Sequence, residues 1–296
     1  MNAQREQQVL KALEHNRRRP PNFTAPRIDM THGAGGKATH KLIEGLLLPA
    51  FNNPALAPLS DAALLPFGDI ALALTTDAFV VRPLAFPGGS IGELAVNGTI
   101  NDLAVSGATP IALSAAMIIE EGLATEVLRR EVDAMANAAA RAGVAITTGD
   151  TKVVERGKGD ELYIITTGVG IVQPGIPLAS TAVRPGDKII CSGTLGDHGA
   201  AILIARGDLD LEADVVSDTR PLTPLVEALK HAVGPDLRFM RDPTRGGVGT
   251  VLNELARDAN CGIAVWEEKL PILDVVHGAA EILGIDPLYM ANEGKL

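Results

Sequence analysis

Aromatic residues are scarce in this sequence: they make up 3% of its 296 residues, although 46% of the chain is hydrophobic. Alanine, valine, isoleucine and leucine must therefore fill the core, together with 31 glycines. Side chains this small are typical of α/β proteins in which helices pack tightly on a sheet. The chain is long enough for one large domain or two ordinary ones.

Other absences exclude whole classes of function. The net charge of −10 argues against nucleic-acid binding, and the only basic run, residues 17–19, lies in a polar N-terminal arm. No stretch approaches about 18 consecutive apolar residues, so we expect no membrane span. Residues 1–27 lack the continuous apolar segment of a signal peptide, and we expect a cytoplasmic protein.

The chain has two cysteines, Cys191 and Cys261, and neither belongs to a metal-ligand spacing. Each lies in or beside an apolar stretch that we interpret as a strand. We therefore expect both thiols to be buried and inert.

The sequence predicts three parts. Residues 1–27 form an extension with a short helix around residues 7–13, residues 28–175 form an N-terminal domain, and residues 176–296 form a C-terminal α/β domain. The boundary lies at the proline- and glycine-containing turn of residues 173–177. Strands and helices are predicted to alternate in both domains.

Apolar runs and helical spacing predict the elements of each domain. In the N-terminal domain we expect helices around residues 42–47, 91–105 and 125–141, a charged hairpin tip at 155–160, and strands at 61–67, 70–81, 111–119, 144–148 and 162–172. In the C-terminal domain we expect strands at 189–192 and 262–266, and helices at 200–206, after Pro224 and at 251–258.

One predicted helix, within residues 91–105, combines a buried character with polar residues. Its small apolar side chains suit tight packing on a sheet, but Asn97, Asn101 and Asp102 interrupt that face. Asn97 and Asn101 lie one turn apart, so their amides emerge on one side. Burying these groups is costly unless something binds them. The alternative is a helix end at which Asp102 caps a loop.

Four aspartates, Asp61, Asp77, Asp102 and Asp150, each lie at the start or end of an element that its neighbours predict to be buried. Folds of the α/β class place ligands at such positions. If these carboxylates converge, they need a cation, and oxygen ligands together with phosphate favour Mg²⁺ and a nucleotide. The alternative is that each aspartate caps a turn on its own. No Ser/His/Asp or Cys/His arrangement can be assembled from the six histidines.

A glycine-rich loop, residues 29–37, precedes the helix expected at 42–47. Such a loop offers backbone N–H groups to an anion. It is not a Walker A loop, because Thr31 stands where that motif needs its first glycine and Ala38 follows the lysine. A plain flexible loop is the alternative.

Five segments resemble the HypE-type hydrogenase maturation family, within the aminoimidazole ribonucleotide synthetase superfamily. In chain order they are residues 32–37, 86–89, 95–108, 148–157 and 242–248. The resemblance covers nearly everything after residue 27. The segment Asn-Asp-Leu-Ala-Val-Ser-Gly-Ala is shared across the superfamily, whereas residues 149–157 and the closing Ala-Asn-Glu-Gly at 291–294 are more particular to the HypE type.

The resemblance implies an ATP-dependent carbamoyl dehydratase. In this family a C-terminal cysteine receives a carbamoyl group from a HypF-type carbamoyltransferase. ATP then phosphorylates the thiocarboxamide oxygen, and loss of phosphate leaves a thiocyanate. The cyano group passes to the iron of the [NiFe]-hydrogenase site on a HypC–HypD-type scaffold. ATP and Mg²⁺ are the implied cofactors.

The resemblance also implies the fold: a two-domain aminoimidazole-ribonucleotide-synthetase-like α/β architecture with α+β layers. It implies a homodimer in which the sheets of the N-terminal domains form a barrel around the ATP sites. Apolar strands such as residues 70–75 and 162–172 support a dimer, because they would otherwise leave a sheet edge or face uncovered.

Site residues follow from the resemblance by matching positions. The Mg²⁺ and phosphate positions are Asp61, Asp77, Asp102 and Asp150. Nucleotide-binding positions are Asn101, Asp150 and Thr151 together with the mobile loop residues Gly35, Gly36 and Lys37. Lys152 and Glu293 are expected to stabilise charge and to take the proton from the thiocarboxamide nitrogen. Asp242 and Arg245 fit either a catalytic role or a turn in which the aspartate caps the next helix.

The sequence departs from the family at its end. Family members continue beyond Asn-Glu-Gly and end in Pro-Arg-Ile-Cys, whereas the sequence stops at Leu296. We therefore expect a C-terminal domain that is truncated and lacks the thiol that carries the substrate. Two alternatives are another superfamily enzyme, such as a selenophosphate synthetase, and a tail-less platform that binds nucleotide and partners without turnover. The former usually carries a reactive cysteine near the glycine loop, and here that region has none.

Overall fold

The structure is a computed structural model that describes residues 22–176, 178–207 and 213–296. Contacts divide the chain into two compact units, residues 1–58 and 59–296, and each is described by itself. The helix predicted around residues 7–13 and the basic run at 17–19 lie outside the described residues.

The described part of the first unit is helical. A 3₁₀ turn, η1 (Met30–Gly33), precedes α2 (Lys37–Leu42), the π turn η2 (Ile43–Leu47) and α3 (Leu48–Phe51). The side chain of Asp29 accepts a hydrogen bond from the Thr31 N–H, and the His32 side chain accepts one from the Asp29 N–H. This reciprocal capping box fixes the first residues of the glycine-rich loop. The helix predicted around residues 42–47 is confirmed.

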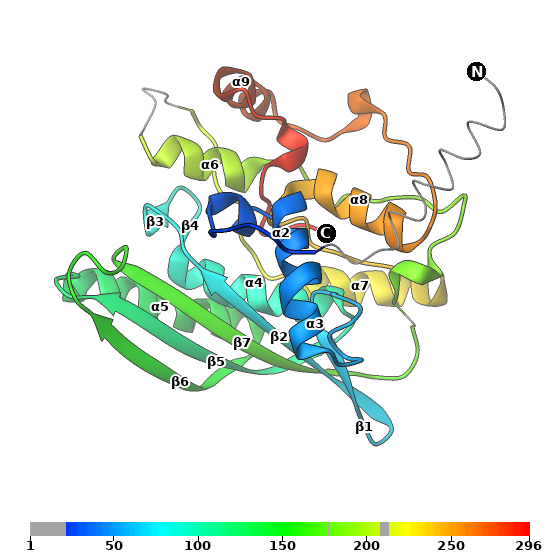
Figure 1. The fold of residues 1–296 in the computed structure, drawn as a ribbon, viewed down its shortest axis with the longest axis horizontal. Helices are drawn as coiled ribbons and strands as arrows, with labels where there is room; N and C mark the ends of the chain where they lie inside the picture. Colours follow the sequence, from blue (N-terminus) through cyan, green and yellow to red (C-terminus); the bar gives the residue numbers. More distant parts are fainter. Residues whose placement is uncertain (1–21, 177, 208–212) are drawn as a thin grey trace. The chain divides into compact units, whose positions relative to one another are not determined.

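The second unit is built on a five-stranded sheet with the order β1-β2-β7-β5-β6 (Figure 1). β5 and β6 are parallel, and the other neighbouring strands are antiparallel. All five predicted strands of this region are confirmed, with shifted ends: β1 (Ala63–Phe67), β2 (Ile70–Phe79), β5 (Thr109–Glu120), β6 (Ala145–Val154) and β7 (Leu162–Val172). A short pair, β3 (Ala85–Phe86) and β4 (Gly89–Ser90), leads into the first long helix.

The predicted hairpin around residues 155–160 is wrong. β6 and β7 are consecutive in the chain, but β5 lies between them, so the connection passes the end of β5. Glu120 at that end accepts hydrogen bonds from the N–H groups of Gly157 and Glu161. The carboxylate thus organises the connection, and β6 extends to Val154 rather than ending at Thr148.

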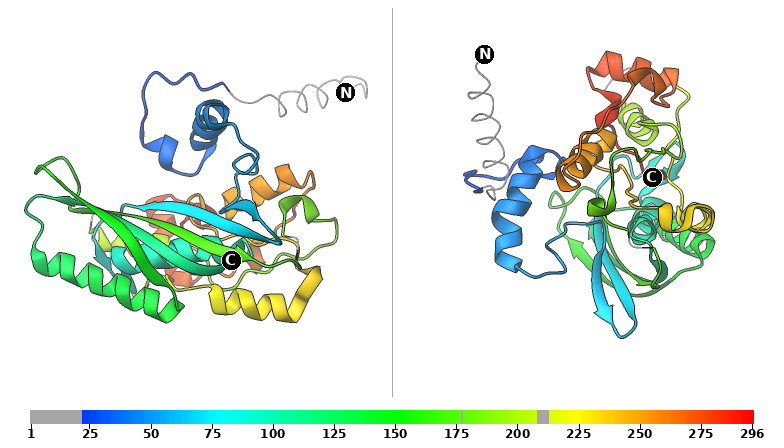
Figure 2. Two further views of the ribbon diagram at one scale, coloured as in Figure 1. Left: turned by 90° about the horizontal axis from the view of Figure 1, so that it is seen from below. Right: turned by 90° about the vertical axis from the view of Figure 1, so that its right-hand side faces the viewer.

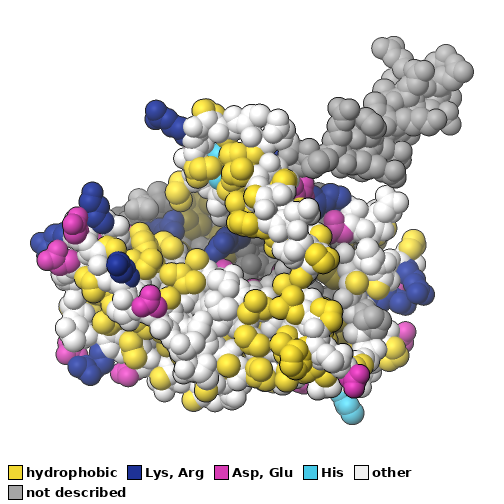
Figure 3. Space-filling view, turned by 60° about the horizontal axis from the view of Figure 1, so that its bottom comes forward, with side chains coloured by type: hydrophobic (Ala, Val, Ile, Leu, Met, Phe, Trp, Pro, Cys, Tyr) yellow, Lys and Arg dark blue, Asp and Glu magenta, His cyan; other side chains and the backbone are white. Residues whose placement is uncertain are grey.

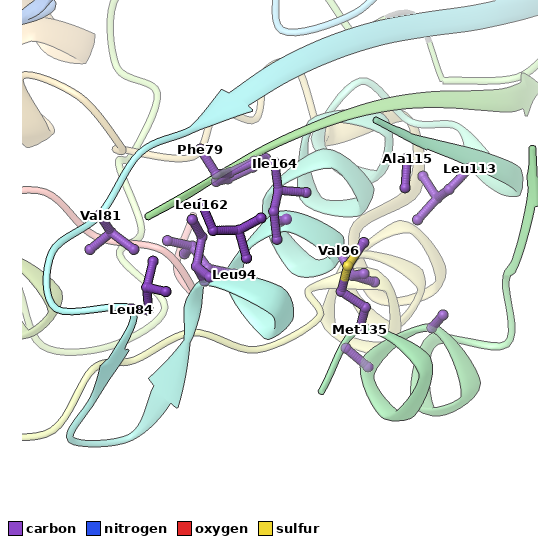
Figure 4. Packing of buried hydrophobic residues seen from close by; sticks show 14 of the residues in the cluster. Phe79, Val81, Leu84, Leu94, Val96, Leu113, Ala115, Met135, Leu162 and Ile164 are labelled. Atoms are coloured by element: carbon purple, nitrogen blue, oxygen red, sulfur yellow. The ribbon is translucent and has the colours of Figure 1, made fainter. Parts of the chain in front are cut away.

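Two helices, α4 (Ile91–Val105) and α5 (Thr125–Ala142), lie along one face of the sheet (Figure 2). Both confirm the sequence prediction. The core between α4, α5 and the sheet is aliphatic apart from Phe79, Phe86 and Met135, as the composition required (Figure 4). α4 is buried on nearly every side. No helix among the described residues is both long and apolar enough to cross a membrane.

The opposite face of the sheet carries no helix among the described residues of the second unit. Side chains alternate along β2, where Ala73, Thr75 and Phe79 are buried, whereas Leu74 on the other face is 39% exposed. Leu65 and Phe67 on β1 pair with Leu72 and Ile70 of β2, so they share the face of Leu74, and both are exposed. Figure 3 shows hydrophobic side chains gathered at the molecular surface. We call the side of the sheet opposite to α4 and α5 the open face.

The remainder of the second unit is helical. Its helices are α6 (Asp197–Ala205), α7 (Thr223–Val233), α8 (Gly247–Asp258) and α9 (Asp274–Leu283), with 3₁₀ turns η3 (Ser180–Ala182), η4 (Gly234–Asp236), η5 (Glu267–Lys269) and η6 (Pro287–Tyr289). Three helices were predicted and are confirmed, whereas α9 was missed.

The strands predicted at residues 189–192 and 262–266 are wrong for the described structure. Both segments are irregular, because a strand needs a neighbouring backbone to form a ladder. Ser192 N–H donates to the carbonyl of Leu296 at 3.0 Å, which is a single bond rather than a ladder. Cys191 and Cys261 are correspondingly half-buried rather than buried.

The contact between α4 and α5 predicts a steric test. A β-carbon at Gly92 of α4 would lie 2.2 Å from the carbonyl oxygen of Glu131 in α5, whereas one at Gly278 of α9 meets nothing within 4 Å. We expect Gly92→Ala to destabilise the fold by about 1–3 kcal/mol through overpacking. Gly278→Ala should be neutral or stabilise by up to about 1 kcal/mol. Denaturant unfolding measures both, and equal stability of the two variants would contradict the close approach.

Candidate functional site

Three carboxylates meet beside the C-terminal half of α4. One carboxyl oxygen from each of Asp61, Asp102 and Asp242 lies within 4.8 Å of the others. Asp61 precedes β1, Asp102 lies in α4, and Asp242 lies in the segment before α8. The Thr75 hydroxyl on β2 is 2.8 Å from Asp102 Oδ2 and 2.8 Å from the Asp61 carbonyl oxygen. We call these three aspartates the carboxylate cluster.

The electrostatics of the carboxylate cluster favour a bound cation. Burial raises the pKa of Asp61 to about 6 and that of Asp242 to about 8, and it raises the pKa of Asp102 well above its usual value. Charge repulsion adds to each shift: Asp61 raises the pKa of Asp102 and of Asp242, and Glu254 raises that of Asp61. The Arg241 guanidinium, whose Nε lies 2.9 Å from Asp61 Oδ1, offsets part of it. Three convergent carboxylates suit a hard dication such as Mg²⁺, so the residues fit the metal that the resemblance implied.

Asp77 lies beside the carboxylate cluster. Its charge raises the pKa of all three members. Burial raises the pKa of Asp77 itself, and Arg245 partly offsets this. The Arg245 Nη2 atom lies 3.4 Å from Asp77 Oδ1 and donates to the Ala78 carbonyl at 2.9 Å. Arg245 therefore connects the segment before α8 to β2.

The interpretation of Asp242 as a helix cap is wrong. The N-cap of α8 is Gly246, and no side chain caps that helix. Asp242 is instead 4% exposed and joins the carboxylate cluster. Sequence reasoning left it out of the metal set, although an aspartate ahead of the Pro-Thr-Arg-Gly-Gly turn was the available signal. The idea that Asp102 caps a loop is also wrong, because its carboxylate contacts Thr75 and the cluster.

Asp150 does not reach the carboxylate cluster within one chain. It lies on the edge strand β6, three strands away from β2 in the sheet. Asp77 pairs with Thr166, which pairs with Ala115, whereas Asp150 pairs with Ala116, so the two aspartates occupy opposite faces. Lys152, two residues along, shares the open face with Asp150, while Thr151 points to the other side.

Glu293 faces the carboxylate cluster from the end of the chain. Its N–H donates to the Asp218 carboxylate at 3.3 Å, and its carbonyl accepts from Asn101 Nδ2 at 2.9 Å. Burial raises the pKa of the Glu293 carboxyl well above its usual value, and the charges of Asp242 and Asp77 raise it further. A buried carboxyl of this kind is suited to proton transfer near neutral pH.

The side-chain amide of Asn101 forms its hydrogen bonds with backbone groups of the same chain. Its Nδ2 donates to the carbonyls of Arg220 at 3.0 Å and Glu293 at 2.9 Å, and its Oδ1 accepts from the Leu222 N–H at 2.7 Å. The donors that we expected it to offer to a nucleotide are therefore occupied. Asn97, one turn earlier, donates to Thr219 Oγ1 at 3.2 Å. The hydrogen-bond partners of these two side chains all come from the part of the chain that follows β7.

The loop residues Gly35, Gly36 and Lys37 belong to the first unit. Gly35 has φ +77° and donates its N–H to Thr39 Oγ1 at 3.0 Å. Gly36 is the N-cap of α2, and Lys37 is its first residue. The positive φ requires glycine, because a β-carbon is strained in the left-handed region.

Comparisons with known proteins agree on one family. Residues 59–172 match the N-terminal domain of AIR synthase related proteins, and residues 184–296 match the C-terminal domain. The carbamoyl dehydratase HypE of Cupriavidus necator is 51% identical over 280 residues, which are 94% of this chain and 79% of that protein.

Two crystal structures are similar over most of the chain. One is a HypE–HypF complex, with 48% identity and a TM-score of 0.81, matched over 86% of this chain and 82% of that one. The other is the hydrogenase maturation protein HypE in complex with ATP, with 47% identity and a TM-score of 0.73, matched over 91% and 80%. The chain has the two-domain AIR synthase related fold, and it belongs to the HypE family of hydrogenase maturation proteins.

Proposed function

We propose that the chain catalyses the ATP-dependent dehydration of a carbamoylated cysteine, a thiocarboxamide, to a thiocyanate, which supplies the cyanide ligand for the iron of a [NiFe]-hydrogenase. The observation that carries this proposal is the carboxylate cluster with Glu293 beside it. Two further findings support it. Relatives that are 51% and 52% identical are named carbamoyl dehydratase, and a similar HypE structure contains ATP.

The chemistry requires a leaving group and a base. An amide oxygen leaves poorly, so the γ-phosphoryl group of ATP is transferred to it, which yields ADP and an O-phosphorylated intermediate that has lost one N–H proton. Breaking the carbon–oxygen bond then releases phosphate, and loss of the second N–H proton leaves the carbon–nitrogen triple bond. Glu293 in its ionised form accepts a proton from that nitrogen.

Asp61, Asp102 and Asp242 would hold Mg²⁺, which when bound neutralises the charge of the phosphates. Arg241 keeps the Asp61 carboxylate in place from one side, and Thr75 holds Asp102 from another. Asn101 fixes the backbone of Glu293 relative to α4, which also carries Asp102. One helix, α4, thereby positions both Glu293, the proton acceptor, and Asp102, one of the three carboxylates for the metal.

We also propose a homodimer formed through the open face. The exposed apolar side chains on this face would leave a large sheet surface in water, which a second copy would bury. Asp150 and Lys152 project from the same face, and the family resemblance implies a barrel around the ATP sites. We infer that both residues act at the site of the partner subunit. The other proposed partners are a HypF-type carbamoyltransferase and a HypC–HypD-type scaffold.

The dehydration itself can be measured by intact-mass spectrometry. We expect the chain, extended by the family ending Pro-Arg-Ile-Cys and carbamoylated there, to lose one water when Mg²⁺ and ATP are added.

Asp242→Asn should abolish Mg²⁺-dependent ATP binding in calorimetry and slow water loss by at least about 100-fold, because a buried ligand charge is removed. Asp236→Asn in η4, which is exposed, is the matched control and should behave as the parent. ATP hydrolysis without water loss from the cysteine would contradict the proposed function.

The raised pKa values predict how stability depends on pH. The folded chain keeps a proton on Asp242 up to about pH 8, whereas the unfolded chain releases it above the ordinary value of 3.8. Folded protein therefore binds more protons in this window, and stability falls as pH rises from about 4 to about 8.

Thermal unfolding in a chelator tests this sign. The drop in melting temperature between pH 5 and 8 should be smaller for Asp242→Asn than for the parent, by roughly 2–4 °C for each kcal/mol removed. Added Mg²⁺ should raise the melting temperature of the parent most at the higher pH, since metal binds the ionised carboxylates. A parent and variant with parallel pH curves would contradict a protonated cluster.

Mixed dimers test the assignment of Lys152 to the partner's site. Dimers of Asp102→Asn alone and of Lys152→Ala alone should both be inactive. If each site takes its lysine from the other chain, unfolding and refolding an equal mixture creates sites with neither defect, and about a quarter of the parent activity should return. Mixtures that stay inactive would place Lys152 and Asp102 at the same chain's site.

A further inference from the structure

A histidine that the proposed chemistry does not use lies against Glu293. His198 is the second residue of α6, is 6% exposed, and packs its ring edge-to-face on Phe86 at 5.6 Å between centroids. Its Nε2 atom lies 3.9 Å from Glu293 Oε1. Sequence reasoning found no hydroxyl partner for this histidine, but the fold supplies one.

That partner is Ser217. Its Oγ lies 2.8 Å from His198 Nδ1 and accepts a hydrogen bond from the Thr219 N–H at 3.2 Å. The bond from Thr219 uses one lone pair of the hydroxyl and leaves its hydrogen free to be donated to Nδ1. When the hydroxyl donates this hydrogen, Nδ1 is the acceptor, and the hydrogen of a neutral imidazole sits on Nε2. The contact with Ser217 thus supports the tautomer whose N–H points at Glu293.

The surroundings keep the ring neutral. Burial lowers the pKa of His198 to about 4. The negative charge of Asp218 raises this pKa, and the positive charge of Lys295 lowers it. The Lys295 ammonium group is itself buried and bound to Asp197 at 2.7 Å and Asp218 at 3.1 Å. The charged groups that act on Glu293 are Asp242, Asp77 and Asp218, which disfavour its carboxylate form, and Arg245, which favours it.

We propose that His198 is a positioning residue for Glu293: as substrate binds, its Nε2–H donates a hydrogen bond to the Glu293 carboxylate and holds it, ionised and oriented, toward the thiocarboxamide nitrogen. The 3.9 Å separation is longer than a hydrogen bond, and a shift of about 1 Å closes it. The backbone of Glu293 is fixed by Asp218 and Asn101, so the side chains of Glu293 and His198 make this movement. The inference rests on the proposed function, because it concerns the same proton transfer.

Two substitutions separate the donor from the bulk of the ring. His198→Asn keeps an amide near Nδ1 for Ser217 but has no atom at Nε2, whereas His198→Gln extends an N–H donor toward Glu293. The assay is single-turnover water loss from the full chain bearing the carbamoylated Pro-Arg-Ile-Cys ending, followed by intact mass. We expect His198→Asn to be slower by about 10- to 100-fold, since one hydrogen bond to a charged group is lost. His198→Gln should stay within about 3-fold of the parent, and calorimetry should show unchanged Mg·ATP affinity for both.

Ser217→Ala is a third variant, and it leaves the ring in place if His198→Asn proves unfolded. We expect a loss of about 3- to 10-fold, because the ring can then carry its hydrogen on either nitrogen. A parent rate for His198→Asn, or equal losses for the asparagine and glutamine variants, would overturn the positioning role while the parent's water loss upheld the proposed function. A parent that binds Mg·ATP yet loses no water would overturn the proposed function, and this inference with it.

Discussion

The hydrogen bonds of the Asn101 side chain join the two halves of the second unit. A buried amide in the middle of a helix that packs on a sheet would cost several kcal/mol without partners. Here three backbone groups from residues 220, 222 and 293 satisfy it, and they lie more than a hundred positions away in the chain. Because Asp102 is the next residue of α4, the same bonds that satisfy the amide also set Glu293 beside the carboxylate cluster.

The carboxylate cluster illustrates how a binding site opposes stability. Asp61, Asp102 and Asp242 are held together by elements that are each fixed for other reasons, namely the start of β1, the interior of α4 and the segment before α8. Burial, together with repulsion from neighbouring carboxylates, raises all three pKa values, so the folded chain retains protons that it would otherwise release. A dication bound by these carboxylates would relieve the repulsion and would thereby stabilise the folded chain.

The open face leaves apolar side chains of a single chain exposed to water. In the described part of the second unit, helices cover one side of the sheet, and the edge strand β6 carries the Gly-Asp-Thr-Lys segment in an exposed position. Asp150 and Lys152 of this segment lie away from the carboxylate cluster of their own chain, so a site shared between two copies would give both residues a role. The open face and the position of Lys152 therefore support one and the same assembly.

Local patterns in the sequence were sufficient for the sheet strands β1, β2, β5, β6 and β7 and for the helices α4 and α5, because hydrophobic spacing and turn residues act within a few positions. The same patterns were enough to single out Asp61, Asp77 and Asp102 as candidates. They failed at residues 189–192 and 262–266, where a strand depends on a partner that local sequence does not reveal. They also paired β6 with β7, although strand order depends on which backbones meet. Only the tertiary structure brought Asp242 into the carboxylate cluster, left Asp150 on the opposite face, bound Asn101 to distant carbonyls and set His198 between Ser217 and Glu293. Each of these is a contact between residues far apart in the chain, and such contacts are decided by how the elements pack.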